Sequence, residues 1–275
     1  MPDVCILTDS TVQFTRIDFP GRELVKIISF DVISAAHGKG PYLPPAQAMA
    51  GLPQGLSSPA YQDFLDQYIL LGAKFREIMV LTLSASLGLT GCYAREAAVQ
   101  YSGSAQVQVI DSQTTAMGLG LLVQLAAEAA ASGASLAAIE RLIRAAIHRV
   151  YTLFCIPGLA YLSGVGCLSP SQAIVGEMLG LLPIFVLEDG HLSLLSKVRT
   201  PRHLLESFQD FIEEFSDPLY IGLIKAASGG HFRTRLLRQH VKEHFTQVNW
   251  SECVINPHLA ALIGPQSMGL VIMEH

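Results

Sequence analysis

Short apolar runs that end in polar residues recur along the first half of the chain. Three of them are Val4–Thr8, Ile78–Leu83 and Val107–Ile110. A run of this length that is apolar at nearly every position is typical of a strand buried on both faces, as in a parallel sheet. We therefore predict three core strands in this half.

Helical patterns separate these strands. Pro59–Phe75 follows Ser58 as an N-cap and has Pro at its first helical position, and Cys92–Tyr101 is rich in Ala. Thr114–Ser132 is a third helix, and Ser135 can cap a fourth that has apolar residues at helical spacing. Strands that alternate with helices imply a parallel sheet.

The pattern changes after Tyr151. Pro183–Leu187 is an apolar run that leads into Glu188-Asp189-Gly190, and an Asp-Gly turn favours an antiparallel hairpin. We therefore predict an α/β protein of two domains, with a parallel sheet in residues 1–150 and antiparallel pairing in residues 151–275. Two amphipathic helices and an apolar strand are expected in the second domain: Pro201–Phe215, His231–Phe245 and Leu219–Ile224.

The composition narrows the classes of function. Half of the 275 residues are hydrophobic and 15% are charged, so much apolar surface must be buried in a core or presented to an apolar ligand. The net charge of -5, without a block of Lys and Arg, argues against nucleic acid as a partner. Without a signal-peptide pattern or an apolar run of ~18 residues, we expect a soluble cytoplasmic protein that is not integral to the membrane. Five scattered cysteines, none in a CxxC motif, argue for reduced thiols and against zinc.

All three predicted strands of the first domain are followed by hydroxyl and carboxyl side chains. These segments are Thr8–Thr11, Ser84–Gly91 and Asp111–Thr115. In an open parallel sheet, ligands bind beyond the carboxyl ends of the strands, where free helix amides meet. Any one of these Ser and Thr residues can be a simple helix cap, but three such segments together favour a site for a carboxylate or a phosphate.

A catalytic apparatus is not complete anywhere in the sequence. Asp9 and Asp111 could act as general bases or metal ligands, but carboxylates at strand ends more often fix loop geometry. No G-x-S-x-G motif is present, and His240 and His244, one helical turn apart, have no third metal ligand. We expect no metal, no cofactor and no catalysis.

Taken in order, the motifs resemble those of the DegV family of bacterial fatty-acid-binding proteins over nearly the whole chain. The Ser86–Tyr93 segment is a variant of that family's SSxLSGTY loop. The other matching pieces are Thr8–Thr11, Val109–Ser112, Met117–Gly120, Leu159–Leu162, Leu182–Ile184, Gly190, Lys197–Thr200 and Gly264–Pro265.

The resemblance implies a three-layer α/β/α first domain with a parallel sheet and a second α/β domain with a largely antiparallel sheet. It also implies a long-chain fatty acid between them, with the tail in an apolar tunnel and the carboxylate bound by hydroxyls and a His. Such a protein presents the acid to a separate kinase and performs no chemistry itself. The head-group residues carried over to this chain are Ser86, Thr90, Gly91, Gln54, Ser10, Gly264 and Gln266, and the tail residues are Leu262, Phe154 and Ile156.

Three positions depart from the family pattern. Gln54–Ser58 stands where the family has TSQPS, Leu262 stands where it has the head-group His, and Cys167 stands where it has an Arg that meets the kinase. A buried ligand carboxylate that lacks the family's TSQPS segment and head-group His needs other hydrogen-bond donors. The head group is therefore held by Ser86, Thr90 and helix amides, or the ligand is neutral or weakly anionic, or binding has been lost.

Two rival functions stay open at this point. One is a phosphotransferase, because the first domain of the DegV family resembles part of dihydroxyacetone kinase. The catalytic residues of such an enzyme would be Asp9 and Asp111. The other is a scaffold whose degenerate pocket is filled by bulky side chains such as Leu262.

Overall fold

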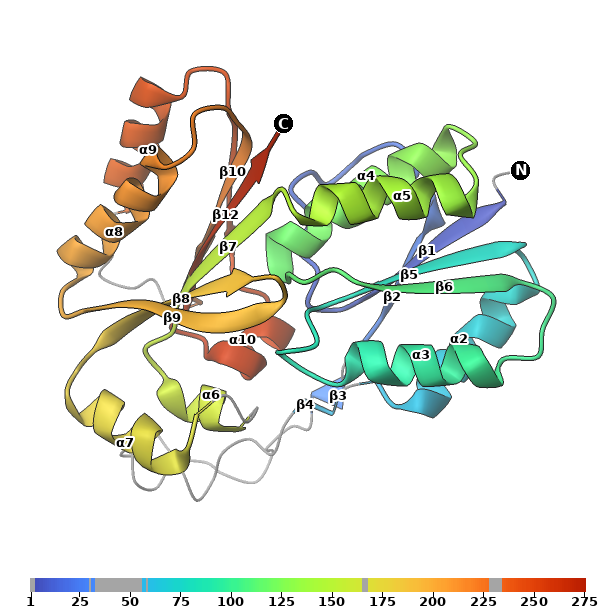
Figure 1. The fold of residues 1–275 in the computed structure, drawn as a ribbon, viewed down its shortest axis with the longest axis horizontal. Coiled ribbons are helices and arrows are strands. Elements are labelled where there is room, and N and C mark those ends of the chain that lie inside the picture. The colour runs from blue at the N-terminus through green and yellow to red at the C-terminus, as the bar shows by residue number, and fades with distance from the viewer. Residues whose placement is uncertain (1–2, 30, 33–55, 58, 165–167, 228–233) are drawn as a thin grey trace. The chain divides into compact units, whose positions relative to one another are not determined.

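The computed structural model describes residues 3–29, 31–32, 56–57, 59–164, 168–227 and 234–275. The chain divides into two compact units (Figure 1). The N-terminal unit comprises residues 1–31, 57–150 and 189–191, and the C-terminal unit comprises residues 32–56, 151–188 and 192–275. Both units combine helices with a sheet, which confirms the predicted α/β class.

The sheet of the N-terminal unit has four strands, and all neighbouring strands in it are parallel. In spatial order they are β2 (Val25–Ile28), β1 (Val4–Asp9), β5 (Glu77–Thr82) and β6 (Gln106–Asp111). Three of these match the predicted strands to within a residue at each end. A separate two-stranded sheet pairs β3 (Asp31–Val32) with β4 (Leu56–Ser57).

Helices cover both faces of this parallel sheet, as a three-layer arrangement requires (Figure 1). On one face, Phe64 and Tyr68 of helix α2 pack with Cys5 and Leu7 of β1 in an apolar cluster. Cys5 and Leu7 lie on the same face because successive side chains of a strand alternate between its two faces. The short helix η1 spans Arg22–Leu24. The lower pair is α2 (Tyr61–Gly72) and α3 (Thr90–Gln100), and the upper pair is α4 (Ala116–Ala131) and α5 (Leu136–Ile147).

The helix starts differ in part from the prediction. Helix α2 begins at Tyr61 rather than Pro59, because the Asp63 carboxylate accepts a hydrogen bond from the Ala60 amide at 2.7 Å and makes Ala60 the N-cap. Helix α3 begins two residues earlier than expected, at Thr90. The predicted cap of α5 is confirmed, since the Ser135 hydroxyl accepts a hydrogen bond from the first turn.

The C-terminal unit has a six-stranded, mostly antiparallel sheet. Pairs β10–β12 and β7–β8 are antiparallel, whereas β10–β11 is parallel. The hairpin between β8 and β9 turns at Asp189 (φ 47°) and Gly190 (φ 77°), which confirms the predicted Asp-Gly turn. In spatial order the strands are β11 (Asn249–Val254), β10 (Pro218–Lys225), β12 (Met268–Glu274), β7 (Val150–Cys155), β8 (Leu182–Glu188) and β9 (His191–Val198).

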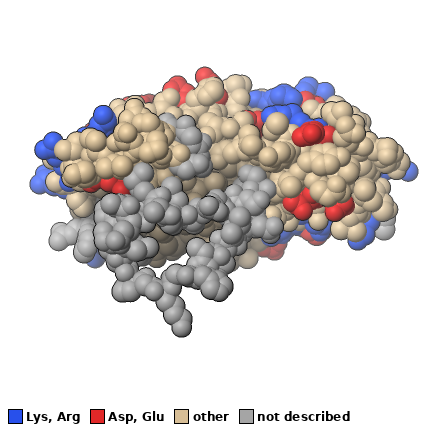
Figure 2. All heavy atoms as spheres, turned by 90° about the horizontal axis from the view of Figure 1, so that it is seen from below, with Lys and Arg blue, Asp and Glu red and all other residues tan. Residues whose placement is uncertain are grey.

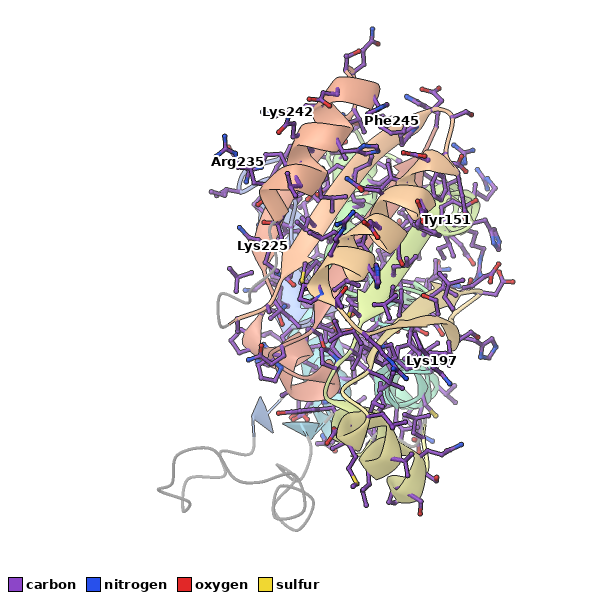
Figure 3. All side chains as sticks on the ribbon, turned by 90° about the vertical axis from the view of Figure 1, so that its left-hand side faces the viewer. Tyr151, Lys197, Lys225, Arg235, Lys242 and Phe245 are labelled. Carbon is purple, nitrogen blue, oxygen red and sulfur yellow. The ribbon has the colours of Figure 1, made fainter. Side chains whose placement is uncertain are left out.

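Two amphipathic helices, α8 (Pro201–Glu213) and α9 (Thr234–His244), lie side by side over one face of this sheet (Figures 1 and 3). Phe208 of α8 and Leu237 of α9 are fully buried in the core between helices and sheet. The described part of the unit also contains three short helices: α6 (Leu159–Gly164), α7 (Pro170–Met178) and α10 (Pro257–Ile263).

A buried carboxylate joins α9 to the edge of the sheet. Glu252 of β11, with a side chain only 8% exposed, forms ion pairs with Lys225 at 3.1 Å and with Arg238 of α9 at 2.5 Å. The Trp250 indole donates a further hydrogen bond to it at 3.2 Å. Hydrogen bonding from Arg238 is the main reason that the pKa of Glu252 falls from 4.5 to about 2. Figure 3 shows Lys225 at this end of the sheet and Arg235 and Lys242 on α9.

Charges of both signs are interspersed over the described surface in Figure 2, so that this face presents no field of one sign. Among the described helices, none has the length and apolar character needed to cross a bilayer.

Candidate functional site

Buried polar side chains gather at the carboxyl edge of the parallel sheet. Parallel strands end at the same edge, so segments far apart in the sequence meet there. Strand order reverses between β1 and β5, which is the point at which open α/β sheets bind ligands. The buried polar residues at this edge are Thr8, Asp9, Ser10, Thr11, Thr82, Ser84, Thr90, Ser112, Thr114 and Thr115.

Asp9 organises the loops at the reversal point. Its fully buried carboxylate accepts hydrogen bonds from the Thr11 amide at 3.0 Å, the Thr11 hydroxyl at 2.6 Å and the Leu83 amide at 2.7 Å. The Thr115 hydroxyl in turn donates to the Thr11 hydroxyl at 3.1 Å. Burial raises the pKa of Asp9, and the three donors partly oppose this shift. The Asp9 carboxylate thus joins the loops after β1 and β5 directly, and the loop after β6 is connected to it through Thr11.

Asp111 has the same role at the end of β6. It accepts hydrogen bonds from the Gln113 amide at 2.9 Å and the Ala85 amide at 3.1 Å. The prediction that these two aspartates fix loop geometry is therefore confirmed for Asp111 and for Asp9. The loop after β6 is also strained, because Gln113 (φ 56°) and Ala116 (φ 51°) are non-glycine residues in the left-handed region.

Two serines follow β5 in the same neighbourhood. The Ser84 hydroxyl donates to the carbonyl of Gly190 at 2.5 Å and lies 3.1 Å from the hydroxyl of Ser86. Ser84 is buried, whereas Ser86 is half-buried. The predicted ligand residue Ser86 is therefore the more accessible of the two, and Ser84 holds the turn at Gly190 in place.

The first turn of α3 is the least satisfied part of this edge. The N-cap of α3 is Leu89, which is 58% exposed and forms no side-chain hydrogen bond to the first turn. Leu is a poor N-cap residue because its side chain has no acceptor. Thr90 in this turn and Thr82 at the adjacent end of β5 are both 0% exposed, and neither hydroxyl has a hydrogen-bond partner among the described residues. A buried hydroxyl without a partner costs about 1–3 kcal/mol, so two at one helix start are typical of a site that a ligand completes.

Gly91 is needed at this helix start because the end of β5 lies so close to it. A Cβ on Gly91 would lie 2.9 Å from the Thr82 hydroxyl oxygen. Thr82 was missed by the sequence analysis. Its position as the last residue of a buried strand, directly before the hydroxyl-rich loop, is the signal that could have drawn attention to it.

The sequence-predicted ligand residues fall into two sets, one in each unit. Ser10, Ser86, Thr90 and Gly91 lie in the N-terminal unit at the edge described above. Gln54 and Cys167 lie outside the described residues.

The other predicted ligand residues belong to the C-terminal unit. Phe154 and Ile156 are buried, and the Phe154 ring packs against the backbone of Gly269. Leu262 on α10 is 8% exposed. Gly264 ends this helix with φ 95° beside the ring of Tyr161, and Gln266 is exposed.

Two hollows lie at the opposite edge of the parallel sheet or beside it. One, of about 520 Å³, is lined by Arg76, Glu77 and Gln106 at the amino ends of β5 and β6. The other, of about 420 Å³, is lined by Ile69 of α2 and Tyr101 after α3. Neither is lined by residues of the carboxyl edge, so we do not assign the candidate site to them. Within the described ranges, His, Cys, Asp and Glu form no cluster of three that could hold a metal ion.

The sequence matches a known protein family over nearly its whole length. The model of the DegV family, described as uncharacterised proteins, matches residues 4–275. A DegV domain-containing protein of Staphylococcus aureus is 28% identical over 219 residues, which cover 79% of this chain and 78% of that protein.

Two solved structures share the fold. One is a DegV family protein from Thermus thermophilus, described by its fatty acid binding; its TM-score is 0.77 at 22% identity, with 99% of this chain and 100% of that one covered. The other is the Streptococcus pneumoniae Fatty Acid Kinase (Fak) B3 protein loaded with linoleic acid, with a TM-score of 0.76, 17% identity and 99% coverage of both chains. Because the family model spans nearly the whole sequence, the chain belongs to the DegV family.

Proposed function

We propose that this protein binds a long-chain fatty acid or a closely related single-chain lipid and carries it without transforming it. The observation that carries the proposal is the start of α3, which has no side-chain cap and where the buried hydroxyls of Thr82 and Thr90 have no partner among the described residues. Amides at a helix N-terminus and hydroxyl donors together suit a carboxylate. The solved relatives from Thermus thermophilus and Streptococcus pneumoniae, described by their fatty acids, support the same class of ligand.

The proposed head-group residues within the N-terminal unit are Ser86, Thr90, Gly91 and Ser10. The proposed tail residues are Leu262, Phe154 and Ile156.

The absence of chemistry is part of the proposal. The two carboxylates that a phosphotransferase would need, Asp9 and Asp111, are both engaged by loop amides. A carboxylate used in this way is a poor general base, because its lone pairs are already directed at donors. A thermal-shift screen with nucleotides and magnesium should leave the unfolding temperature unchanged.

A partner kinase is the least supported part of the proposal. The Streptococcus pneumoniae relative bears the name of a fatty acid kinase protein, which favours a partner of that kind. Cys167, however, stands where the resemblance places the Arg that meets the kinase. A pull-down with the kinase from the same genome tests this part separately, and failure to recover the complex would remove the kinase from the proposal.

Lipid extraction tests the central claim. Protein purified natively from several expression hosts should release an acyl lipid that mass spectrometry identifies. Reloaded protein carrying Ser86→Ala or Thr90→Val should bind the fatty acid more weakly by about 1–3 kcal/mol, because each change removes a hydroxyl donor. The absence of any acyl species in every host, together with no binding on reloading, would overturn the proposal.

A further inference from the structure

Arg95 lies one helical turn beyond Gly91 on α3, and its guanidinium is directed back toward the helix start. A guanidinium nitrogen lies 3.7 Å from the point that a Cβ on Gly91 would occupy, and the Thr82 hydroxyl oxygen lies 2.9 Å from the same point. Residues four apart share a helix face, and helical side chains lean toward the N-terminus. A cation and an unpartnered hydroxyl therefore meet over the first turn of α3.

This position is electrostatically unfavourable for an arginine in the absence of an anion. The N-terminus of a helix carries a partial positive charge, so a cation beside it is repelled and an anion is attracted. Among the described residues, no carboxylate forms an ion pair with Arg95. The exposed side chain nonetheless lies against the helix start.

Helix α5 shows what is missing in α3. There, Arg144 pairs at 2.8 Å with Glu140, the residue four positions before it on the same helix. The residue four positions before Arg95 is Gly91, which has no side chain. Unlike Arg144, Arg95 therefore has no carboxylate one helical turn before it, and an anion from outside the chain can take that role.

We propose that Arg95 binds the anionic head group of the lipid over Gly91, together with the hydroxyls of Thr82 and Thr90. This inference rests on the proposed function and deepens it, because it makes Arg95 the residue that selects a charged head group over a neutral one. It also decides between the alternatives left by the sequence: the ligand is an acid rather than an alcohol or an ester. A carboxylate is the head group to which we commit, and a phosphate monoester has related chemistry.

Isothermal titration with three ligands of equal chain length tests the inference: dodecanoic acid, dodecanol and dodecyl phosphate. The variants are Arg95→Gln, Arg95→Lys and, as a matched control, Arg141→Gln, which removes an exposed arginine from α5 on the other face of the sheet. We expect Arg95→Gln to weaken dodecanoate by about tenfold or more and to change dodecanol by less than about twofold, as for loss of a hydrogen bond to a charged group. Arg95→Lys should retain part of the affinity, and Arg141→Gln should retain all of it.

The possible failures can be told apart. If the wild type binds neither dodecanoate nor dodecanol, and hexadecanoic acid does not bind either, the proposed function itself is wrong. If the wild type binds dodecanoate and Arg95→Gln binds it equally well, the proposed function stands and the role of Arg95 is wrong. Equal losses for acid and alcohol with a lowered unfolding temperature would show a structural role and overturn the inference. Clearly tighter binding of dodecyl phosphate than of dodecanoate would reassign the head group to a phosphate.

Discussion

The two units differ in how many polar side chains they bury and in where these side chains lie. Among the described residues, the C-terminal unit buries the polar residues Thr152 and Ser267 and the ion-paired carboxylate of Glu252. The N-terminal unit buries the ten residues of the carboxyl edge and Gln124. The core of the C-terminal unit is instead a continuous apolar cluster between α8, α9 and the sheet.

This difference supports the choice of the carboxyl edge as the proposed ligand site. Burying polar groups opposes folding unless hydrogen bonds compensate, so a fold has no reason to concentrate them at one edge for stability alone. Asp9 is well compensated, whereas Thr82 and Thr90 are not. The carboxyl edge therefore contains two kinds of polar residue: those that hold the loops together, and those whose hydroxyls form no hydrogen bond within the described part of the chain.

The largest effect should come from removing Asp9. Asp9→Ala leaves the Leu83 amide and the amide and hydroxyl of Thr11 without their acceptor in a closed interior. We expect a loss of about 3–5 kcal/mol in the free energy of unfolding, measured by urea denaturation followed by circular dichroism. The exposed Asp18→Ala is the control and should change stability by less than about 0.5 kcal/mol. Equal free energies of unfolding for the two variants would show that the hydrogen bonds to Asp9 do not stabilise the fold.

A smaller effect is expected from Glu252 in the C-terminal unit. Glu252→Gln removes ion pairs with Lys225 and Arg238 and should cost about 2 kcal/mol at neutral pH. The folded pKa of about 2 lies below the usual 4.5, so the contribution of the ionised carboxylate is present above pH 4.5 and is lost as the pH falls toward 2. The stability difference between wild type and variant should shrink over that range when the fluorescence of Trp250, the single Trp, is followed in urea at each pH.

The control for this prediction is an ion pair in the same unit that is open to solvent. Glu206→Gln on α8 breaks the exposed pair with Arg202 and should cost less than about 0.5 kcal/mol at any pH. A pH-independent deficit for Glu252→Gln would contradict the assignment of its stabilisation to the ionised carboxylate.

The smallest effect, and the most diagnostic, has opposite signs in the two units. Thr90→Val replaces an unpartnered buried hydroxyl by a methyl group of similar size and should stabilise the empty protein by about 1 kcal/mol while weakening lipid binding. Thr152→Val, at a buried threonine that does have a partner, should destabilise the protein and leave binding unchanged. Thermal unfolding with and without dodecanoic acid measures both quantities. Destabilisation by Thr90→Val would mean that its hydroxyl serves the fold rather than a ligand.

The prediction from sequence succeeded where burial is uniform. Strands β1 and β5 are buried along nearly their whole length, so their residues are mostly apolar and the pattern is easy to see. The edge strand β6 is largely half-buried and was recognised from its apolar residues Val107, Val109 and Ile110. Strand β11 was missed because it is an edge strand with half-buried, partly polar residues such as Glu252. Strand β2 was missed because it has only four residues, two of them exposed.

The residues of the candidate site likewise divide into those that the sequence pointed to and those that it did not. The family resemblance led to Thr90 and Gly91, because these residues belong to a recognisable loop. It did not lead to Thr82 or Arg95, whose relevance depends on the distance of each from the backbone of Gly91. No local pattern encodes such a distance, since it depends on how β5 and α3 pack.

By itself, the sequence determined the parallel and antiparallel halves, the Asp-Gly hairpin and the presence of hydroxyls after each core strand. These features follow from local rules of periodicity, turn geometry and strand direction. Only the tertiary structure decided that Asp9 is fully bonded, that Thr82 and Thr90 are not, and that Arg95 lies over Gly91. The reason is that hydrogen-bond satisfaction and charge proximity depend on groups brought together from different elements, so they exist only once the chain has folded.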